Sequence, residues 1–506
     1  MTAACPSTTS IEYADWKAPA GDEQFLIWPQ PADLLTQTLE NQRALSNCQC
    51  VQFQGVSLAE LRRETRQWIG HDHDQPLVAT GHQTELYHPG VWIKNALIDA
   101  AATKLGGQAY HLAVETDEPK HLLLSWPGVQ HPITDDPQLS TARWSGLLAP
   151  PTPAHLNELM SSLRKDAAEW PFQPCAGHVL QTMRRQLLES DNLPSLIVNA
   201  THELDWDLGL RHHALLMSPV WTTRPYLLFV HHLLAHASEL AADYNAALAD
   251  YRRRHDIRAP GRPMPDLAIS DDDVECPFWL DDLDNGTRSR LHVQRRGNLW
   301  HLSIGGSDGI AFDPSATADA AAEALGTLLR QTRYRIAPRA LTLTLFIRLM
   351  LADNFIHGIG GGRYDQVLDT LIQRHFRIKP PHFGVTTATL YFPTAVGRQR
   401  VCLPCLQQQG HHLRHNLLPD KPQIVAAIAQ APRLSRERSL LFSQMHQRLA
   451  DARQNDPRLR QWQQRWQDAL KRDHEDRVLF NRELFYALQP RERLIAMIDQ
   501  YRSAFA

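Results

Sequence analysis

The sequence of 506 residues predicts a mixed α/β fold, and three observations lead to that prediction. A strand, a helix and a second strand follow one another between residues 77 and 114, short β-type runs cluster over 268–312, and helix follows helix beyond Pro419. A strand–helix–strand unit builds a parallel sheet with a right-handed crossover. We therefore expect a parallel-sheet core with inserted connecting segments, one of them β-rich, and a helical C-terminal region.

The strand–helix–strand unit is defined by its apolar spacing and by its boundary residues. Residues 77–80 form a short apolar run, which is typical of a buried strand. Apolar residues recur at helical spacing over 89–105, where Pro89 opens the helix and Gly106 follows it. Residues 109–114 are a second apolar run, so we expect two neighbouring parallel strands.

Further apolar patterns extend this fold along the chain. Short runs predict strands at 195–199 and 386–392, and Leu-rich stretches predict one helix over 224–255 and another over 339–355. The turn sequence Asn285-Gly286 is typical of a β-hairpin in the β-rich segment.

Four regions are predicted from these elements. They are 1–265, the first part of the core; 266–315, the β-rich insertion; 316–400, the second part of the core with a glycine-rich loop; and 401–506, an α-helical domain. The last hundred residues alternate charges with Leu, Trp and Met, as in a helical hairpin or coiled-coil arm. We expect these helices to form a homodimer contact.

The composition excludes several classes of function. Lys and Arg total 52 and Asp and Glu total 55, a balance that gives no basic footprint for nucleic acid. The longest apolar stretch, 340–355, is interrupted by Arg348 and Asp353 and is too short to span a bilayer. The N-terminus lacks the pattern of a secretory signal, and seven cysteines are too few for a disulfide framework. We expect a cytoplasmic protein with small-molecule substrates, bound to neither membrane nor nucleic acid.

Two predicted loops and one turn carry polar residues suited to chemistry. The loop from Thr80 to Gly90 joins a strand's carboxyl end to a helix N-terminus, where α/β sheets bind ligands and helices favour anions. The turn 115–121 follows the second strand, so it should lie at the same edge. The glycine-dense loop 357–365 brings backbone close to a ligand. The candidate residues are Thr80, Gly81, His82, Gln83, Lys94, Glu115, Asp117, His357, Gly360, Gly361, Arg363 and Asp365.

Each of these segments also has a structural interpretation. The first is then an ordinary turn, the acidic residues a solvated turn, and the glycines a flexible connector. The first loop matches neither a Walker A sequence nor a G-x-G-x-x-G fingerprint.

A fourth candidate is the C-x-x-C pair of Cys402 and Cys405 with the later His411 and His415. Such residues can hold zinc, but the spacing is shorter than in common zinc fingers, which disfavours a metal site. A thioredoxin-type redox pair is also disfavoured, because no predicted strand leads directly into a helix that bears the pair.

Several motifs resemble the bacillithiol-biosynthesis cysteine-adding enzyme family. Thr80-Gly81-x-Gln83, followed by Leu86, Pro89 and Lys94, resembles the family's T-G-Q-Q-x-x-L-x-x-x-P-x-x-x-x-K segment, with one residue fewer before the proline. The strand ending in Glu115-Thr116-Asp117 is similar to the family's strand ending in E-D-H-D, and 341–361 is similar to its helix and I-G-G-P-G-E loop. The order of these segments matches over about residues 80–395.

The resemblance implies a Rossmann-like core, a coiled-coil arm and a dimer. It implies a ligase-like reaction that joins the carboxyl group of cysteine to the amine of glucosaminyl-malate, and it leaves the use of ATP or ADP open. His82 replaces the family's first Gln, the acidic turn lacks the histidine, and the glycines continue as Gly-Arg-Tyr-Asp. A diverged relative with a different small-molecule substrate, or a non-catalytic metabolite-binding protein, is therefore the alternative.

An amide ligase needs an activated carboxylate, a neutral amine and stabilisation of charge at the acyl carbon. Under this hypothesis His82, Gln83, Glu115 and Asp117 are catalytic: a carboxylate binds the ammonium group and takes its proton, and His82 carries protons. The other candidates bind substrate or nucleotide, with Arg363 holding a carboxylate.

Overall fold

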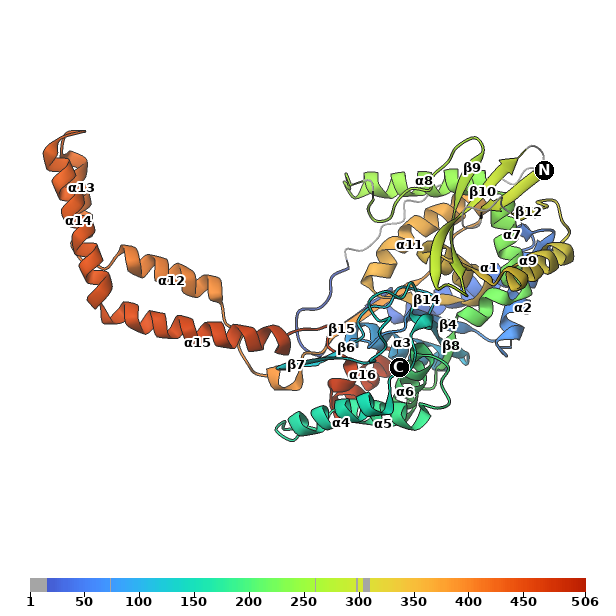
Figure 1. Ribbon diagram of the computed structural model, residues 1–506, viewed down its shortest axis with the longest axis horizontal. Coiled ribbons are helices and arrows are strands. Elements are labelled where there is room, and N and C mark those ends of the chain that lie inside the picture. The colour runs from blue at the N-terminus through green and yellow to red at the C-terminus, as the bar shows by residue number, and fades with distance from the viewer. Residues whose placement is uncertain (1–15, 73, 260, 297–298, 304–309) are drawn as a thin grey trace. The chain divides into compact units, whose positions relative to one another are not determined.

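The computed structural model describes the chain except for residues 1–15, 73, 260, 297–298 and 304–309, and the chain divides into two compact units (Figure 1). Unit 1 comprises Met1–Ser125, Gln130–Leu390 and Arg482–Ala506, and unit 2 comprises Trp126–Val129 and Tyr391–Asn481. The predicted helical region 401–506 thus falls in both units, because its last 25 residues, 482–506, belong to unit 1.

A six-stranded, mostly parallel sheet forms the centre of unit 1, as the sequence predicts for an α/β fold. Its order is β1 (Gln24–Trp28), β15 (Gly384–Thr389), β14 (Asn354–His357), β4 (Leu77–Gln83), β5 (Gln108–Val114) and β8 (His213–Leu216). Only β1 runs antiparallel to its neighbour in this sheet. The predicted strands at 77–80 and 109–114 pair in parallel along their whole length, from Leu77 opposite Gln108 to Gln83 opposite Val114.

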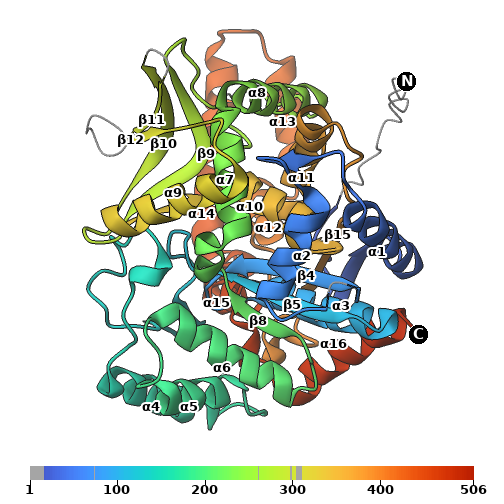
Figure 2. The same ribbon diagram turned by 90° about the vertical axis from the view of Figure 1, so that its right-hand side faces the viewer.

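The chain leaves the centre of this sheet in two directions. From β4 it passes through α3 (Pro89–Leu105) to β5, and from β14 it passes through α11 (Ile359–Leu371) to β15. Because parallel crossovers are right-handed, these two helices cover opposite faces of the sheet, as Figure 2 shows. The carboxyl ends of β4 and β14 therefore open into a crevice, which is where open α/β sheets bind ligands.

A second sheet is antiparallel and contains the predicted β-rich insertion. Its order is β12 (Ile310–Phe312), β11 (Leu299–Ser303), β10 (Thr287–Arg296), β9 (Asp273–Asp282) and β13 (Tyr334–Pro338). The predicted turn at Asn285-Gly286 joins β9 to β10, and Gly286 has a left-handed φ of 64°. Two short strands, β2 (Gln52–Phe53) and β3 (Val56–Ser57), form a separate hairpin.

Helices make up most of the remainder of unit 1. They are α1 (Pro31–Ser46), α2 (Leu58–Trp68), α4 (Pro153–Ala167), α5 (Ala176–Gln186), α6 (Leu193–Asp207), α7 (Arg224–Ala235), α8 (Ala237–Arg254), α9 (Ala318–Thr332), α10 (Ala340–Phe346) and α16 (Arg491–Ala504). Strands β6 (Leu123–Trp126) and β7 (Val129–Pro132) lie in the connection between β5 and α4.

Four predicted elements differ from the structure. The strand predicted at 195–199 is wrong: these residues lie in α6, where the Asn192 side chain accepts the Ser195 N–H at 2.9 Å in a capping box. A short apolar run alone cannot distinguish a buried strand from a buried helix. The single helix predicted over 224–255 is two helices, α7 and α8, which meet at His236.

The helix predicted over 339–355 is also wrong at its C-terminal end. After α10 comes a π-helical turn, Ile347–Leu351, and the chain then becomes extended at Ala352 and enters β14. The predicted glycine loop 357–365 is not a loop, because α11 already begins at Ile359. Its glycines lie in the first turn of a helix, where backbone N–H groups have no partner within the helix and can face a ligand.

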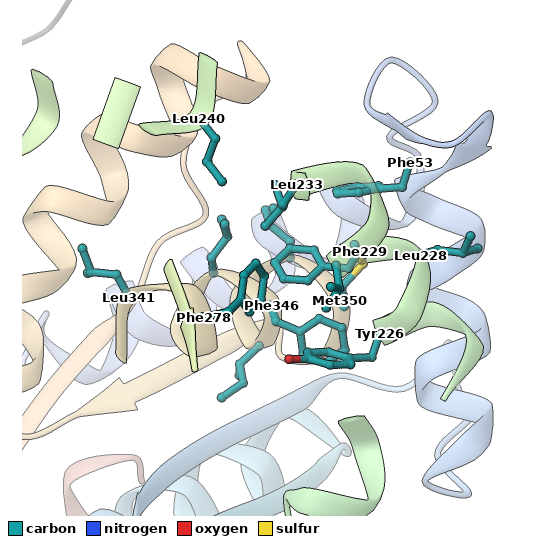
Figure 3. Packing of buried hydrophobic residues seen from close by; sticks show 14 of the residues in the cluster. Phe53, Tyr226, Leu228, Phe229, Leu233, Leu240, Phe278, Leu341, Phe346 and Met350 are labelled. Atoms are coloured by element: carbon teal, nitrogen blue, oxygen red, sulfur yellow. The ribbon is translucent and has the colours of Figure 1, made fainter. Parts of the chain in front are cut away.

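The main hydrophobic core of unit 1 lies among α2, α7, α8, α10 and the β-rich sheet. Figure 3 shows its aromatic centre, in which Phe229 packs against Phe346 with ring centroids 5.3 Å apart and against Phe278 at 6.5 Å. Tyr226 is also buried there, and its hydroxyl donates to the Ile336 carbonyl oxygen at 2.9 Å. This core packs the β-rich sheet against α2, α7, α8 and α10.

One buried carboxylate connects α2 to the centre of the parallel sheet. Asp353 Oδ1 lies 2.5 Å from Arg62 Nη2 and 2.7 Å from Arg66 Nη2, and all three side chains are buried. Asp353 Oδ2 accepts the Leu77 N–H at 2.7 Å, at the start of β4. The Asn41 side chain of α1 donates to the Asp353 carbonyl oxygen at 2.7 Å.

Between Tyr391 and Asn481, unit 2 consists mainly of helices. Its helices are α12 (Leu403–His415), α13 (Lys421–Gln430), α14 (Arg436–Asn455) and α15 (Pro457–Leu479). Helix α12 packs closely against α15, because a Cβ atom at Gly410 would lie 2.2 Å from the Trp462 ring. None of the helices described in the chain is both long enough and apolar enough to cross a membrane.

We expect replacement of Asp353 by Ala to destabilise the protein by about 3–5 kcal/mol, because it leaves two buried guanidinium groups without their counter-charge. Asp284→Ala is the matched control, since its pair with Arg333 is exposed (60% and 61% exposed side chains) and should contribute less than about 1 kcal/mol. Urea unfolding measures both values. Similar losses in the two variants would contradict the assigned role of Asp353.

Candidate functional site

A cavity of about 760 Å³ lies at the crevice between the carboxyl ends of β4 and β14. Most of the residues predicted from the sequence to form a site line it. They are Gly81, His82, Gln83, Lys94, Asp117, His357, Gly360, Gly361, Arg363 and Asp365. The structure therefore brings together the first loop, the acidic turn and the glycine segment, which lie far apart in the chain.

Two of the predicted residues lie outside this cavity. The Thr80 side chain is buried and donates to the Ile356 carbonyl oxygen at 2.7 Å, joining β4 to β14. The Glu115 carboxylate accepts the backbone N–H groups of Met217 and Ser218 at 3.0 and 2.8 Å. Both side chains therefore stabilise the backbone around the cavity and do not line it.

The first turn of α11 lines the cavity, and its backbone N–H groups precede the first hydrogen bond within the helix. Gly358 is its N-cap residue and has no side chain to cap it, and the first intrahelical bond runs from the Gly362 N–H to the Gly358 carbonyl oxygen. Added Cβ atoms at Gly358 and Gly360 would meet no atom within 4 Å. A ligand can therefore approach this backbone closely, and the helix macrodipole favours an anionic group there.

An Asp–His pair lies at the same helix terminus. His357 Nε2 donates to Asp365 Oδ2 at 2.8 Å, and Asp365 Oδ2 also lies 2.7 Å from Arg348 Nη1. Burial raises the pKa of Asp365, but His357 and Arg348 outweigh burial and hold that pKa below its ordinary value. The ionised carboxylate fixes the imidazole tautomer with the proton on Nε2 and the lone pair on Nδ1. Nδ1 lies beside the first turn of α11, because a Cβ atom at Gly361 would lie 2.8 Å from it.

The β4 side of the cavity carries a buried amine. Lys94 Nζ donates to the Gly81 carbonyl oxygen at 2.8 Å, and burial lowers the pKa of Lys94 to about 7. Burial also raises the pKa of nearby Glu85 to about 8, although the Lys94 charge opposes this. Lys94 is therefore able to exchange a proton near neutral pH.

His82, Gln83 and Asp117 complete the β4 side of the cavity. Burial, with the Lys94 charge, lowers the pKa of His82 well below its ordinary value, and His82 Nδ1 lies 3.1 Å from Glu85 Oε1. Gln83 Nε2 donates to Asp117 Oδ2 at 2.7 Å and so orients that carboxylate. His82 is accordingly a neutral hydrogen-bonding group.

The N-terminus of α3 lies against the C-terminal segment of unit 1. His88 caps α3 by accepting the Gly90 N–H at 3.1 Å, and burial lowers the pKa of His88 to about 3. A Cβ atom at Gly90 would lie 2.6 Å from Thr387 Oγ1 and 2.7 Å from Arg482 Nη2, so only glycine allows this approach. Arg482 thereby reaches the cavity wall.

Several cavity residues were not selected from the sequence. Trp16 is buried, and its Nε1–H has no acceptor among the described residues. Arg348 does not line the cavity itself but pairs with Asp365, which does. It interrupts an apolar run, and a buried charge needs a partner, so the sequence carried a signal for this pair. Trp16 and Arg482 carry no comparable signal, because they reach the cavity only through tertiary packing.

The predicted zinc candidates do not form a metal centre in the described part of the chain. Cys402 and Cys405 are joined by a disulfide bond, and no group of three or more His, Cys, Asp or Glu residues there could hold a metal ion.

Replacing Gly360 or Gly362 of α11 by alanine should change the stability of the protein by different amounts. At Gly362 a Cβ atom would lie 2.5 Å from Val385 Cγ2, so we expect Gly362→Ala to destabilise the protein by about 1–3 kcal/mol through overpacking. Gly360→Ala has open space and should change stability by less than about 1 kcal/mol. Denaturant unfolding of the two variants tests this, and an equal effect would contradict the packing described here.

Lys94 should give protein stability a rising dependence on pH. Its pKa of about 7 in the folded chain lies below its ordinary value of 10.5, so between these pH values the unfolded chain binds the additional proton and stability rises with pH. We expect Lys94→Met to show a smaller rise between pH 7 and pH 9 than the wild type. Urea unfolding at three pH values measures it, and equal slopes would show that Lys94 is not desolvated.

Comparison with known proteins adds no family assignment. No protein-family model matches the chain, and no curated protein matches it.

Proposed function

We propose that the protein is an amide-forming ligase that joins the carboxyl group of an amino acid to the amine of a small, anionic, sugar-type acceptor. Cysteine and glucosaminyl-malate are the pair implied by the family that the sequence resembles. The observation that carries the proposal is the uncapped first turn of α11 beside the His357–Asp365 pair, at the crevice between β4 and β14. The strand order β15-β14-β4-β5-β8 supports the Rossmann-like description of the core.

The charges around the cavity support an anionic substrate. Lys17, Lys94, Arg363 and Arg482 line it, against the carboxylates of Asp117, Asp365 and Glu483. Asp365 is already matched by buried Arg348. Basic side chains in the cavity wall and the α11 N-terminus suit a carboxylate or phosphate group, and the same groups would suit the phosphates of ATP or ADP.

The reaction that we propose uses the chain's own donors and acceptors. ATP first converts the carboxyl group to an acyl phosphate, and ADP leaves. When the amine attacks the acyl carbon, the C–N bond forms, the bond from that carbon to the phosphate oxygen breaks, and phosphate leaves. The N–H groups at the start of α11 stabilise the negative charge that develops on the acyl oxygen during this attack. His357 Nδ1 accepts the proton that the amine loses, and Asp365 stabilises the resulting imidazolium ion. Asp117, held by Gln83, binds the ammonium form of the acceptor before it is deprotonated.

Dimerisation through the C-terminal helices is part of the same proposal. In unit 2, Leu440 and Phe442 of α14 have 53% and 51% of their surface exposed. These side chains are available for a helix–helix contact with another chain.

A non-catalytic metabolite-binding protein is the second candidate. Glu115, predicted to act as a catalytic acid or base, is occupied by the backbone N–H groups of residues 217 and 218. This candidate predicts ligand binding at the cavity without product.

The test combines binding and turnover. Purified protein is mixed with cysteine and glucosaminyl-malate, with and without ATP, and product is measured by mass spectrometry. We expect His357→Gln to lower turnover by about 100-fold or more, as for loss of a general base, with little change in melting temperature. His178→Gln, on an α5 side chain that is 39% exposed, is the control. Binding without turnover in the wild type would favour the second candidate, and equal activity of His357→Gln would exclude His357 as the base.

A further inference from the structure

The C-x-x-C pair of unit 2 lies at the start of a helix. Cys402 is the N-cap residue of α12, and its sulfur accepts the Cys405 N–H at 3.2 Å. The two cysteines are bonded to each other, and both are exposed. A sulfur at a helix N-terminus is stabilised as a thiolate by the N–H group and the macrodipole, and an exposed thiolate is the reactive form in thiol–disulfide exchange.

Both sides of the pair are fixed to α15. After the pair, the Leu406 carbonyl oxygen accepts the Trp462 Nε1–H at 2.8 Å. Before it, the Val401 N–H donates to Asp476 Oδ2 at 3.1 Å, and Arg398 Nε lies 2.8 Å from Asp476 Oδ1. These contacts hold the backbone on both sides of the pair when the disulfide is reduced. The same backbone conformation can therefore carry either the dithiol or the disulfide.

An open, polar groove of about 950 Å³ begins at Cys405. Gln409, His411 and His412 line it from α12, and Arg465 lines it from α15. Arg465 is exposed and has no ion pair with any residue that the structure describes. A groove of amides and imidazoles with one unmatched guanidinium group suits a small polar molecule that carries a carboxylate.

We propose that Cys402 and Cys405 are a redox-active pair that exchanges with small anionic thiols and disulfides bound in this groove. This function is independent of the ligase site in unit 1. The sequence analysis disfavours a thioredoxin-type redox pair, because no predicted strand leads into the helix that bears the cysteines. In the structure the N-terminus of α12 can stabilise the Cys402 thiolate without such a strand.

The exchange is balanced between the dithiol and one small disulfide. The Cys402 thiolate attacks one sulfur of the small disulfide, whose S–S bond breaks, and the departing thiolate takes a proton from solvent. The Cys405 thiol loses its proton to solvent, and its sulfur then attacks the Cys402 sulfur and displaces the second small thiolate, which is protonated in turn. Two electrons pass from the protein to the small disulfide, and an excess of the small thiol drives the reverse reaction.

The first experiment asks which sulfur reacts. The reduced, full-length variants Cys405→Ser and Cys402→Ser are mixed with oxidised glutathione, and peptide mapping by mass spectrometry follows the mixed disulfide. We expect Cys402, in the first variant, to be modified about tenfold faster than Cys405 in the second. Equal rates, or a wild-type pair that stays reduced in excess oxidised glutathione, would overturn the proposal.

The second experiment tests the groove. Arg465→Ala should slow oxidation of the wild-type pair by oxidised glutathione about threefold or more, and should leave oxidation by neutral 2-hydroxyethyl disulfide unchanged. Arg433→Ala removes the same charge from the exposed connection between α13 and α14 and should change neither rate. An Arg465→Ala variant that behaves like this control would exclude the groove as the binding site for the anionic partner.

Discussion

The pairing of Asp353 with two buried arginines is the interaction on which the architecture of unit 1 depends. Its carboxylate joins Arg62 and Arg66 of α2 to the first backbone N–H of β4. Burial, with the neighbouring Arg66 charge, lowers the pKa of Arg62 to about 9, and the Asp353 carboxylate opposes that shift. Strands β4 and β14 are thereby held side by side, and the crevice between their carboxyl ends follows from that arrangement.

Burial has opposite consequences for two carboxylates in the region of the candidate site. Burial raises the pKa of Glu85 to about 8, although the charges of Lys94 and Lys120 oppose this shift. Asp365 is also buried, but Arg348 and His357 keep it ionised. Neighbouring charges, and not burial alone, therefore decide in which direction the pKa of each carboxyl group moves.

Glycine has two separate uses in the same helical turn. At Gly362 it allows α11 to approach Val385 of β15, whereas at Gly358 and Gly360 it leaves the backbone open to the cavity. The sequence shows only a cluster of glycines. The packing around each position separates those that hold the helix on the sheet from those that expose its N–H groups.

The sequence by itself determined the local elements whose signals are contained in short segments. The apolar spacing of 77–114 specified a strand, a helix and a parallel strand, and Asn285-Gly286 specified a hairpin turn. Because the carboxyl ends of neighbouring parallel strands share an edge, the grouping of His82, Gln83 and Asp117 also followed from the sequence.

Only the tertiary structure decided what depends on distant partners. The run at 195–199 became a helix because its cap and its burial outweighed its apolar pattern. Glu115 turned towards the backbone of residues 217 and 218, and Arg482 reached the cavity from the C-terminal segment of unit 1. Such contacts are fixed by packing between segments remote in sequence, and no local pattern of residues encodes them.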